Sequence, residues 1–291
     1  MRQLVYTVTA ENDGVTVEAL LYANGIGRRL TVRLKQTPDG LCVAGERVRS
    51  TRVLHAGETL TVTLPAPETV TTRGTIPIIY RDEDIIVCDK PAGMACHRSG
   101  GHIDDTLESA VGERPLRLIG RLDKDTSGVL VLGRHQLAAS RLHGHIEKHY
   151  IAVAGGTLPE KEGDITLPLE RAAAYEPLQT VTPDGAPCRT YYRVLWQGEG
   201  MSLVLCTPVT GRMHQIRAHL AAVGAPLLGD ALYGGDCGRI KRQALHCRDA
   251  AFTHPFGGKS LRFCAPLPQD MQNLLPDDAL TLIEVTKKND L

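Results

Sequence analysis

The stretch at residues 118–134, LIGRLDKDTSGVLVLGR, decides how the rest of the chain is interpreted. It opens with an apolar pair, continues through a compact polar run from Arg121 to Ser127, turns at Gly128 and closes with the apolar run at residues 129–132. That pattern predicts a short polar loop leading into a buried strand. A loop held by a buried strand is a place where a fold positions functional groups rigidly.

Asp123 is the first candidate for a catalytic group. It lies between Arg121 and Lys124, and opposite charges nearby favour the ionised carboxylate. An ionised carboxylate can act as a nucleophile. The alternative is that Asp123 and the polar residues after it only cap a turn or a helix start, where these residue types are common. The spacing alone leaves both interpretations open.

Two motifs give the chain a family resemblance. G-R-L-D-K-D-T-S-G at residues 120–128 resembles the H-R-L-D-x-x-T-S-G motif of the RluA family of pseudouridine synthases, in which the aspartate is catalytic. T-G-R-M-H-Q-I-R-A-H-L at residues 210–220 is similar to the T-G-R-x-H-Q-I-R-x-H-L segment of that family. The resemblance covers about residues 77–275, and Gly120 stands where the family usually has histidine.

The resemblance implies an activity and a catalytic set. The chain is expected to isomerise specific uridines of structured RNA, ribosomal or transfer, to pseudouridine, with Asp123 as the catalytic carboxylate. Arg217 is expected to pair with Asp123 from a helix at residues 213–223. Tyr150 is expected to stack on the target base and to accept a proton. The structural alternatives are a surface ion pair for Arg217 and an ordinary strand-end aromatic for Tyr150.

The same resemblance implies a set of substrate contacts. The residues expected to bind substrate are Arg121, Leu122, Thr126, Arg212, His214, Gln215 and Lys90. Lys90, in D-K-P-A-G-M at residues 89–94, is either a phosphate contact or a solvated lysine in a turn. Isomerisation needs no redox change and no second molecule, so no cofactor is expected.

Composition describes an ordinary globular protein. The chain has 291 residues, 42% of them hydrophobic, and 33 basic residues balance 33 acidic ones. Zero net charge argues against a protein that coats nucleic acid non-specifically, but it permits a local basic face. The start has no signal-peptide pattern and no apolar run reaches membrane-spanning length. A cytoplasmic monomer without membrane contact is therefore the expectation.

Metal binding is not expected from the sequence. The eight cysteines are scattered without a C-x-x-C pair, which favours free thiols over disulfides or zinc. The histidines at positions 135, 143, 145 and 149 do not follow a zinc spacing. They are interpreted as exposed residues near RNA.

The pattern divides the chain into four parts. Residues 1–64 form a small α/β module with helices predicted at residues 15–21 and 28–35 and strands at residues 41–43 and 60–64. It resembles the ribosomal-protein S-four type of RNA-binding module, with RNA contacts expected from Arg28, Arg29, Arg33 and Lys35. The alternative is a solvated basic helix.

The other three parts are a linker at residues 65–75, a catalytic domain at residues 76–275 and a charged, mobile tail at residues 276–291. By resemblance the catalytic domain has an α+β fold built on a mixed, largely antiparallel central sheet. Strands are predicted at residues 85–88, 148–153, 190–195 and 202–206, and a helix at residues 136–146. Residues 155–185 have no interpretation.

Two rival functions remain open at this stage. The first is a hydrolase that cleaves a glycosidic bond with Asp123 and Asp125 as a carboxylate pair. Its product would be a free base or sugar, whereas the synthase yields an isomer of unchanged mass. The second is a non-catalytic RNA-binding protein that keeps the fold, which the presence of Asp123, Tyr150 and Arg217 disfavours.

Overall fold

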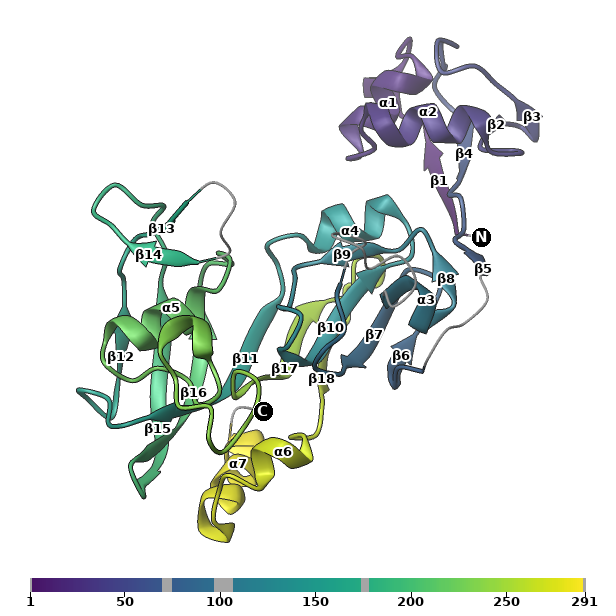
Figure 1. Ribbon diagram of the computed structural model, residues 1–291. Helices are drawn as coiled ribbons and strands as arrows, with labels where there is room; N and C mark the ends of the chain where they lie inside the picture. Colours follow the sequence, from purple (N-terminus) through teal and green to yellow (C-terminus); the bar gives the residue numbers. More distant parts are fainter. Residues whose placement is uncertain (1, 70–74, 97–106, 174–177, 290–291) are drawn as a thin grey trace.

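The computed structural model describes residues 2–69, 75–96, 107–173 and 178–289. A four-stranded sheet lies near the N-terminus and a ten-stranded sheet forms the centre of the molecule, with two small two-stranded sheets beside them. Figure 1 shows the N-terminal module at the end of the molecule opposite β12. Within the described residues no helix is both long and apolar enough to cross a membrane.

The N-terminal module contains two helices on a four-stranded antiparallel sheet of order β1-β4-β2-β3. Both predicted helices are confirmed, and the Thr16 hydroxyl caps the first by accepting a hydrogen bond from the Ala19 amide at 3.2 Å. The first strand was not predicted. The elements of the module are β1 Gln3–Thr7, η1 Ala10–Asn12, α1 Val17–Ala23, α2 Arg28–Gln36, β2 Leu41–Val43, β3 Glu46–Arg47 and β4 Thr59–Thr63.

The segment predicted as a linker is partly built into the catalytic domain. Its β5, Glu68–Thr69, pairs with β8, Glu113–Arg114, of that domain. In addition, Leu137 of the catalytic domain is 1% exposed and belongs to the hydrophobic core of the module. The module is therefore docked on the catalytic domain by packing as well as by the chain connection.

The central sheet is mixed and largely antiparallel, as expected. Its order is β12-β15-β16-β11-β17-β10-β7-β6, with β18 beside β17 and β9 beside β10. Among the described strands, β10 with β17 is the one parallel pair. Every residue of β10 is buried. The strands are β6 Ile78–Arg81, β7 Ile85–Lys90, β9 Arg117–Ile119, β10 Ser127–Gly133, β11 Glu147–Gly155, β12 Glu162–Ile165, β15 Thr190–Gly198, β16 Met201–Pro208, β17 Leu245–Thr253 and β18 Ser260–Cys264.

Two predicted helices are shorter than expected. The helix predicted at residues 136–146 is α4, Gln136–Leu142, because His143 is extended and Gly144 has a φ of 77°. The helix predicted at residues 213–223 is α5, Gln215–Ala222, because His214 has a φ of 53°. The remaining helices are α3 Leu107–Val111, η2 Ala231–Tyr233, α6 Gln269–Gln272 and α7 Asp277–Asn289.

The expected mobile tail is wrong for its described part. It forms α7, in which Ala279 and Ile283 are buried in a hydrophobic cluster with Met271 of α6. Trp196 of β15 also donates a hydrogen bond to Asp278 at 3.0 Å. An apolar pair four residues apart faces one side of a helix, and the charged residues around this pair obscure that signal in the sequence.

The described part of residues 155–185, which had no interpretation, extends the sheet and contacts Tyr233. It contains β12 and the hairpin of β13, Leu169–Arg171, with β14, Gln179–Val181. The Gln179 amide donates a hydrogen bond to the Tyr233 hydroxyl at 2.9 Å. All eight cysteines are free thiols, as predicted.

Candidate active site

The loop that carries Asp123 is clamped at both ends. It connects β9 to β10, and Leu122 anchors it in the core with 5% exposure. The Thr126 amide donates a hydrogen bond to the Asp123 carbonyl at 3.1 Å, which closes a turn. At Gly128 a Cβ atom would lie 2.1 Å from the Cys247 carbonyl oxygen of the neighbouring parallel strand, so only glycine allows this approach.

Lys90 fixes the loop through hydrogen bonds from its buried side chain. Its side chain is fully buried, and Nζ donates hydrogen bonds to the carbonyls of Pro91 at 2.8 Å, Met94 at 2.9 Å and Lys124 at 2.8 Å. Burial lowers the pKa of Lys90 to about 8. Both sequence interpretations of Lys90, the phosphate contact and the solvated lysine, are therefore wrong. It ties the end of β7 to the residue after Asp123.

Arg217 of α5 reaches Asp123 as expected, through Nη1 and Oδ2 at 3.2 Å. Its bidentate partner is a different carboxylate. Asp230, 2% exposed, accepts hydrogen bonds from Nε at 2.6 Å and from Nη2 at 2.8 Å. Burial opposes the charge of the guanidinium, but the hydrogen bonds and charge of Asp230 outweigh it and raise the pKa of Arg217. The Asp123 side chain itself stays 27% exposed.

Asp230 is a site residue that the sequence reasoning missed. It follows the motif at residues 210–220, within the region of resemblance, and no role was assigned to it from the sequence. The neighbouring Tyr233 places its ring 5.1 Å from the Arg217 Cζ. Two groups therefore fix the orientation of Arg217 before it contacts Asp123.

His214 faces the same carboxylate. Its Nε2 lies 3.8 Å from Asp123 Oδ2, and its Nδ1 lies 3.2 Å from the Tyr233 hydroxyl. Burial lowers the pKa of His214 below 6.5, although the charge of Asp123 opposes this shift. The imidazole is consequently neutral near pH 7, and it can exchange hydrogen bonds with a substrate without adding charge.

Tyr150 lies on β11 between β16 and β17, with 7% exposure. Burial raises the pKa of its phenol well above 10, with further contributions from Cys247 and from the charge of Asp123. The phenol is therefore protonated near neutral pH. It can accept a proton only if it passes its own proton on at the same time.

Three predicted substrate contacts are instead internal supports. Gln215 is 4% exposed, and its side chain accepts hydrogen bonds from Thr210 Oγ1 and the Arg212 amide while donating to the Arg189 carbonyl. Thr126 is 2% exposed and accepts a hydrogen bond from Gln243. Leu122 is part of the core. Because these side chains are enclosed and already partnered, we interpret them as supports of the site rather than as direct contacts to the substrate.

Arg121 and Arg212 are exposed cations near Asp123. Arg121 lies two residues before Asp123, and its charge helps to lower the pKa of His214. Arg212 precedes α5. These two side chains remain available for a polyanion.

Gly120 stands where the family motif usually has histidine, and the local structure explains why glycine fits there. Gly120 has a φ of 77°, a conformation that side chains with a Cβ rarely adopt. A Cβ atom there would also lie 3.0 Å from Nζ of Lys148. The space beside the loop thus holds the lysine side chain from β11.

The histidines near residue 140 fall into two groups. His135 and His149 are buried and contact Asp84 at 3.0 Å and Asp249 at 2.8 Å respectively, so the expectation of exposure is wrong for them. His143 and His145 are exposed as expected. His135 uses its other nitrogen to accept a hydrogen bond from the Ala138 amide at the start of α4.

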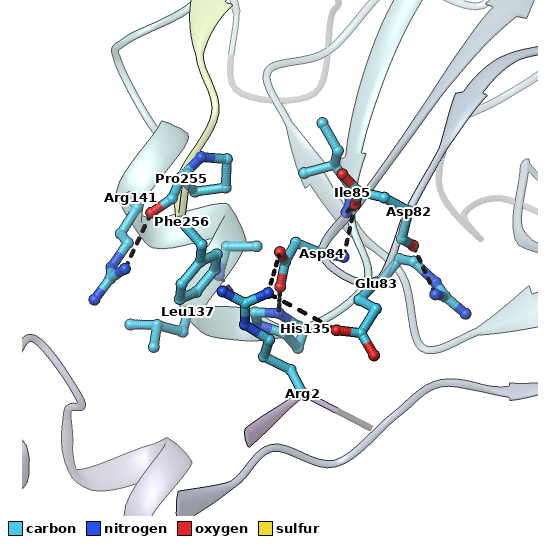
Figure 2. Close-up of polar contacts among 12 residues, drawn as sticks. Arg2, Asp82, Glu83, Asp84, Ile85, His135, Leu137, Arg141, Pro255 and Phe256 are labelled. Atoms are coloured by element: carbon cyan, nitrogen blue, oxygen red, sulfur yellow. Dashed lines mark hydrogen bonds and ion pairs between the residues drawn. The ribbon is translucent and has the colours of Figure 1, made fainter. Parts of the chain in front are cut away.

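A second polar cluster joins the module to the catalytic domain (Figure 2). Asp84 is 2% exposed and receives Arg2 of the module at 3.5 Å and His135 at 3.0 Å. Arg2 also lies over the Phe256 ring, with Cζ 4.7 Å from the ring centroid, while Arg141 lies 4.4 Å from the same centroid. This cluster is a buried contact between two parts of the chain.

The same cluster has metal-ligand atoms close together. One atom each from Asp82, Asp84 and His254 lies within 4.8 Å of the others. Those atoms already have partners, because Asp82 Oδ2 accepts hydrogen bonds from His254 at 2.9 Å and from Tyr80 at 2.8 Å. We therefore interpret the group as an internal hydrogen-bond network.

The cations predicted to bind RNA lie on α2. Arg28, Arg29 and Lys35 are exposed, and Arg33 is half-buried. Leu30 and Leu34 of the same helix are buried in the module core. The helix therefore presents its basic side away from the core.

The fold and the site define a class of enzyme that works with one carboxylate. Asp123 is held by an arginine and a neutral histidine on a rigid loop of a mixed sheet, with a buried tyrosine near it. A model of the RNA pseudouridylate synthase family matches residues 84–222.

Individual relatives agree with that match. The chain is 34% identical over 278 residues, 90% of this chain and 98% of the relative, to the uncharacterized RNA pseudouridine synthase YjbO of Bacillus subtilis. It is 32% identical to ribosomal large subunit pseudouridine synthase D of Zymomonas mobilis, over 92% of this chain and 95% of that protein. The solved structure of human RNA pseudouridylate synthase domain containing 1 superposes with a TM-score of 0.56 at 26% identity, covering 71% of this chain and 93% of that one.

The chain belongs to the RluA family of RNA pseudouridine synthases. It is an isomerase that acts on RNA, and its α+β fold is the fold of this family.

Proposed function

We propose that the chain converts specific uridines of large-subunit ribosomal RNA to pseudouridine, with Asp123 as the catalytic carboxylate. The observation that carries the proposal is the state of this side chain, which is 27% exposed and touched by Arg217 at a single oxygen. A carboxylate that is oriented but still open has an oxygen left for the substrate. The relative from Zymomonas mobilis, whose printed name specifies the ribosomal large subunit, supports the choice of RNA.

The reaction sets clear demands on the site. The bond between ribose and N1 of uracil must break, the base must rotate, and a new bond must form through carbon 5. The target base must leave its stack, at a cost that contacts in the site offset. Asp123 acts as a nucleophile toward the sugar carbon or the base ring, or it stabilises the positive charge that develops on ribose. Carbon 5 loses one proton and N1 gains one, and the product is an isomer of the uridine, so the reaction requires no redox partner and no cofactor.

Arg217 serves as the residue that aims Asp123. Its two hydrogen bonds to Asp230 leave only Nη1 for Asp123, so the direction of the contact is fixed by a buried ion pair. Such orientation before substrate arrives lowers the reorganisation needed during the reaction.

Tyr150 serves as a wall for the base and as the carrier of the carbon-5 proton. Because its phenol is protonated, it takes that proton while releasing its own to a neighbouring acceptor or water. His214, neutral and beside Asp123, hydrogen-bonds the substrate. Arg121 and Arg212 bind phosphates next to the target uridine.

The module formed by residues 1–64 acts as the RNA-binding part of the protein. Its exposed arginines on α2 are the electrostatic signature of a nucleic-acid contact. The protein works as a monomer in the cytoplasm.

The direct test uses purified protein and an Asp123→Ala variant. Each is incubated with unmodified ribosomal RNA and, separately, unmodified transfer RNA, and pseudouridine is mapped by carbodiimide treatment and primer extension. We expect stops at defined uridines of ribosomal RNA with the wild type alone. Free uracil as the product would indicate a glycosidic hydrolase instead, and bound but unmodified RNA would indicate a binding protein.

A further inference from the structure

A narrow crease lies between α2 of the module and the catalytic domain. Its lining includes Arg33 of α2, Pro65 and Pro67 of the connection, and Pro115, Arg117 and Arg134 of the catalytic domain. Arg117 is the first residue of β9. The crease therefore brings cations from two parts of the chain to one place.

Arg134 has a carboxylate partner, whereas Arg33 and Arg117 form no ion pair within the described residues. Arg134 is paired with Glu113 at 2.9 Å. The ion pairs formed within the described part of the chain include neither Arg33 nor Arg117. Burial and then the charge of Arg33 lower the pKa of Arg117, and the charge of Glu108 offsets only part of this effect. Like charges beside apolar walls attract an anion strongly.

The crease is formed before any ligand arrives. Arg2 holds the module against Asp84 and Phe256 (Figure 2), and Leu137 next to the crease is buried in the module core. The relative position of α2 and β9, which carry Arg33 and Arg117, is thus set by packing and by an ion pair to the buried Asp84. Two elements that are already in place need no rearrangement of the backbone when an anion binds between them.

The position of the crease relates it to the active site. β9 runs from Arg117 to Ile119 and leads through Gly120 to Asp123. Six residues of extended chain span at most about 20 Å. Arg28 and Arg29, which precede Arg33 on α2, are exposed. The crease therefore lies beside the end of β10 that carries Gly133, and β9 connects it to the loop that carries the catalytic carboxylate.

We propose that the crease is a phosphate site in which Arg33 and Arg117 jointly bind one backbone phosphate of the RNA outside the catalytic loop. The inference rests on the proposed function, because it takes RNA as the substrate. Guanidinium groups match phosphate oxygens in a bidentate geometry. A phosphate between the two arginines removes their mutual repulsion, and it sets the distance between the module contact and the target base.

The test measures the salt dependence of RNA binding. A fluorescent single-stranded oligouridylate is titrated with the full chain at a series of salt concentrations, using the wild type, Arg33→Gln, Arg117→Gln and the charge-keeping Arg33→Lys and Arg117→Lys. Lys161→Gln is the matched control, because Lys161 is exposed beside β12 at the opposite end of the molecule.

We expect each glutamine variant to lower the slope of log affinity against log salt by about 0.7 and to weaken binding at low salt about threefold. The lysine variants and Lys161→Gln keep the wild-type slope. Unchanged slopes in both glutamine variants would overturn the proposal. Equal loss of slope in the lysine and glutamine variants would also overturn it, since a charge contact survives in lysine.

Two further readouts separate this inference from the proposed function. Without RNA, the melting temperature of Arg33→Gln and Arg117→Gln is expected not to fall, because each change removes a repulsion; a clear fall would contradict the unneutralised pair. A wild type that neither binds nor modifies large-subunit ribosomal RNA would overturn both proposals. A double glutamine variant that modifies this RNA as fast as the wild type would overturn the crease alone.

Discussion

Asp84 and Asp123 are two carboxylates with similar neighbours and different access to solvent. Each lies beside a strand of the central sheet, and each meets an arginine and a histidine from elsewhere in the chain. The Asp84 side chain is 2% exposed, and Arg2 and His135 occupy separate oxygens. The Asp123 side chain is 27% exposed and has one contact from Arg217.

The difference separates a structural carboxylate from a reactive one. A buried charge stays in place only when its partners satisfy it, and removal of one partner leaves an uncompensated charge. Asp84 therefore serves the junction between the module and the catalytic domain (Figure 2). Asp123 keeps free surface, and its own partner Arg217 is held by Asp230 rather than by the aspartate alone.

The largest expected effect is on the rate of Asp123→Asn. The amide keeps the shape of the side chain but lacks the charge, so we expect pseudouridine formation to fall by at least about 10⁴-fold. The urea midpoint of unfolding and RNA affinity stay close to the wild type, because this side chain is partly exposed. If Asp123→Asn retained activity, Asp123 would not be the reactive carboxylate, and its contrast with Asp84 would fail.

Asp84→Asn is expected to show the reverse pattern. Loss of the buried charge leaves Arg2 and His135 without their partner, so the free energy of unfolding falls by about 3 kcal/mol. The rate of the protein that remains folded changes little. Glu83→Gln is the matched control, because Glu83 is exposed and lies 3.8 Å from the same arginine. Equal destabilisation by both changes would contradict the structural role of Asp84.

Tyr150→Phe tests the proton carrier next to Asp123. The phenyl ring still stacks, but the hydroxyl is lost, so we expect about a 10²-fold lower rate, the lower end of what general acid–base catalysis contributes. RNA affinity stays the same. A rate near that of the wild type would show that this side chain only stacks.

Asp230→Asn tests whether Arg217 needs its second partner. Without the charge of Asp230 the guanidinium loses its bidentate clamp, and we expect about a 30-fold lower rate, since misplacement of a catalytic group by about 1 Å costs up to about 10²-fold. The exposed Asp236→Asn in the same segment is the control. We expect Asp230→Asn to lower kcat more than Asp236→Asn does, while both variants keep the same KM. A change confined to KM would contradict the role of Asp230 in aiming Arg217.

The smallest effect is the alkaline limb of the rate. Lys90, with a pKa of about 8, loses one of its three donors to the loop carbonyls as pH rises through that value, so the rate declines there. Stability moves in the opposite direction. The folded pKa is depressed below 10.5, so the unfolded chain binds more protons between these values and this group makes stability rise with pH. In Lys90→Gln the rate is lower, and this limb is expected to be absent.

Sequence patterns predicted the pieces that depend on local order. The loop before β10 and the two helices of the module follow motifs or periodicity within one segment. The contact of Arg217 with Asp123 joins residues 94 apart and was expected only from the family resemblance. The partners of Lys90 did not follow, because Lys124 is 34 residues away and a buried lysine depends on carbonyls that only folding assembles. Asp230 was missed for the same reason, since its role is set by the guanidinium it faces.

A direct test of the role of Asp123 compares the two carboxylates. Wild type, Asp123→Asn and Asp84→Asn, each shown to be folded by circular dichroism, are incubated with the same unmodified large-subunit ribosomal RNA, and pseudouridine is mapped by primer extension. The account predicts stops at the same uridines with the wild type and Asp84→Asn and none with Asp123→Asn. Stops that persist in Asp123→Asn, or that vanish only in Asp84→Asn, would contradict it.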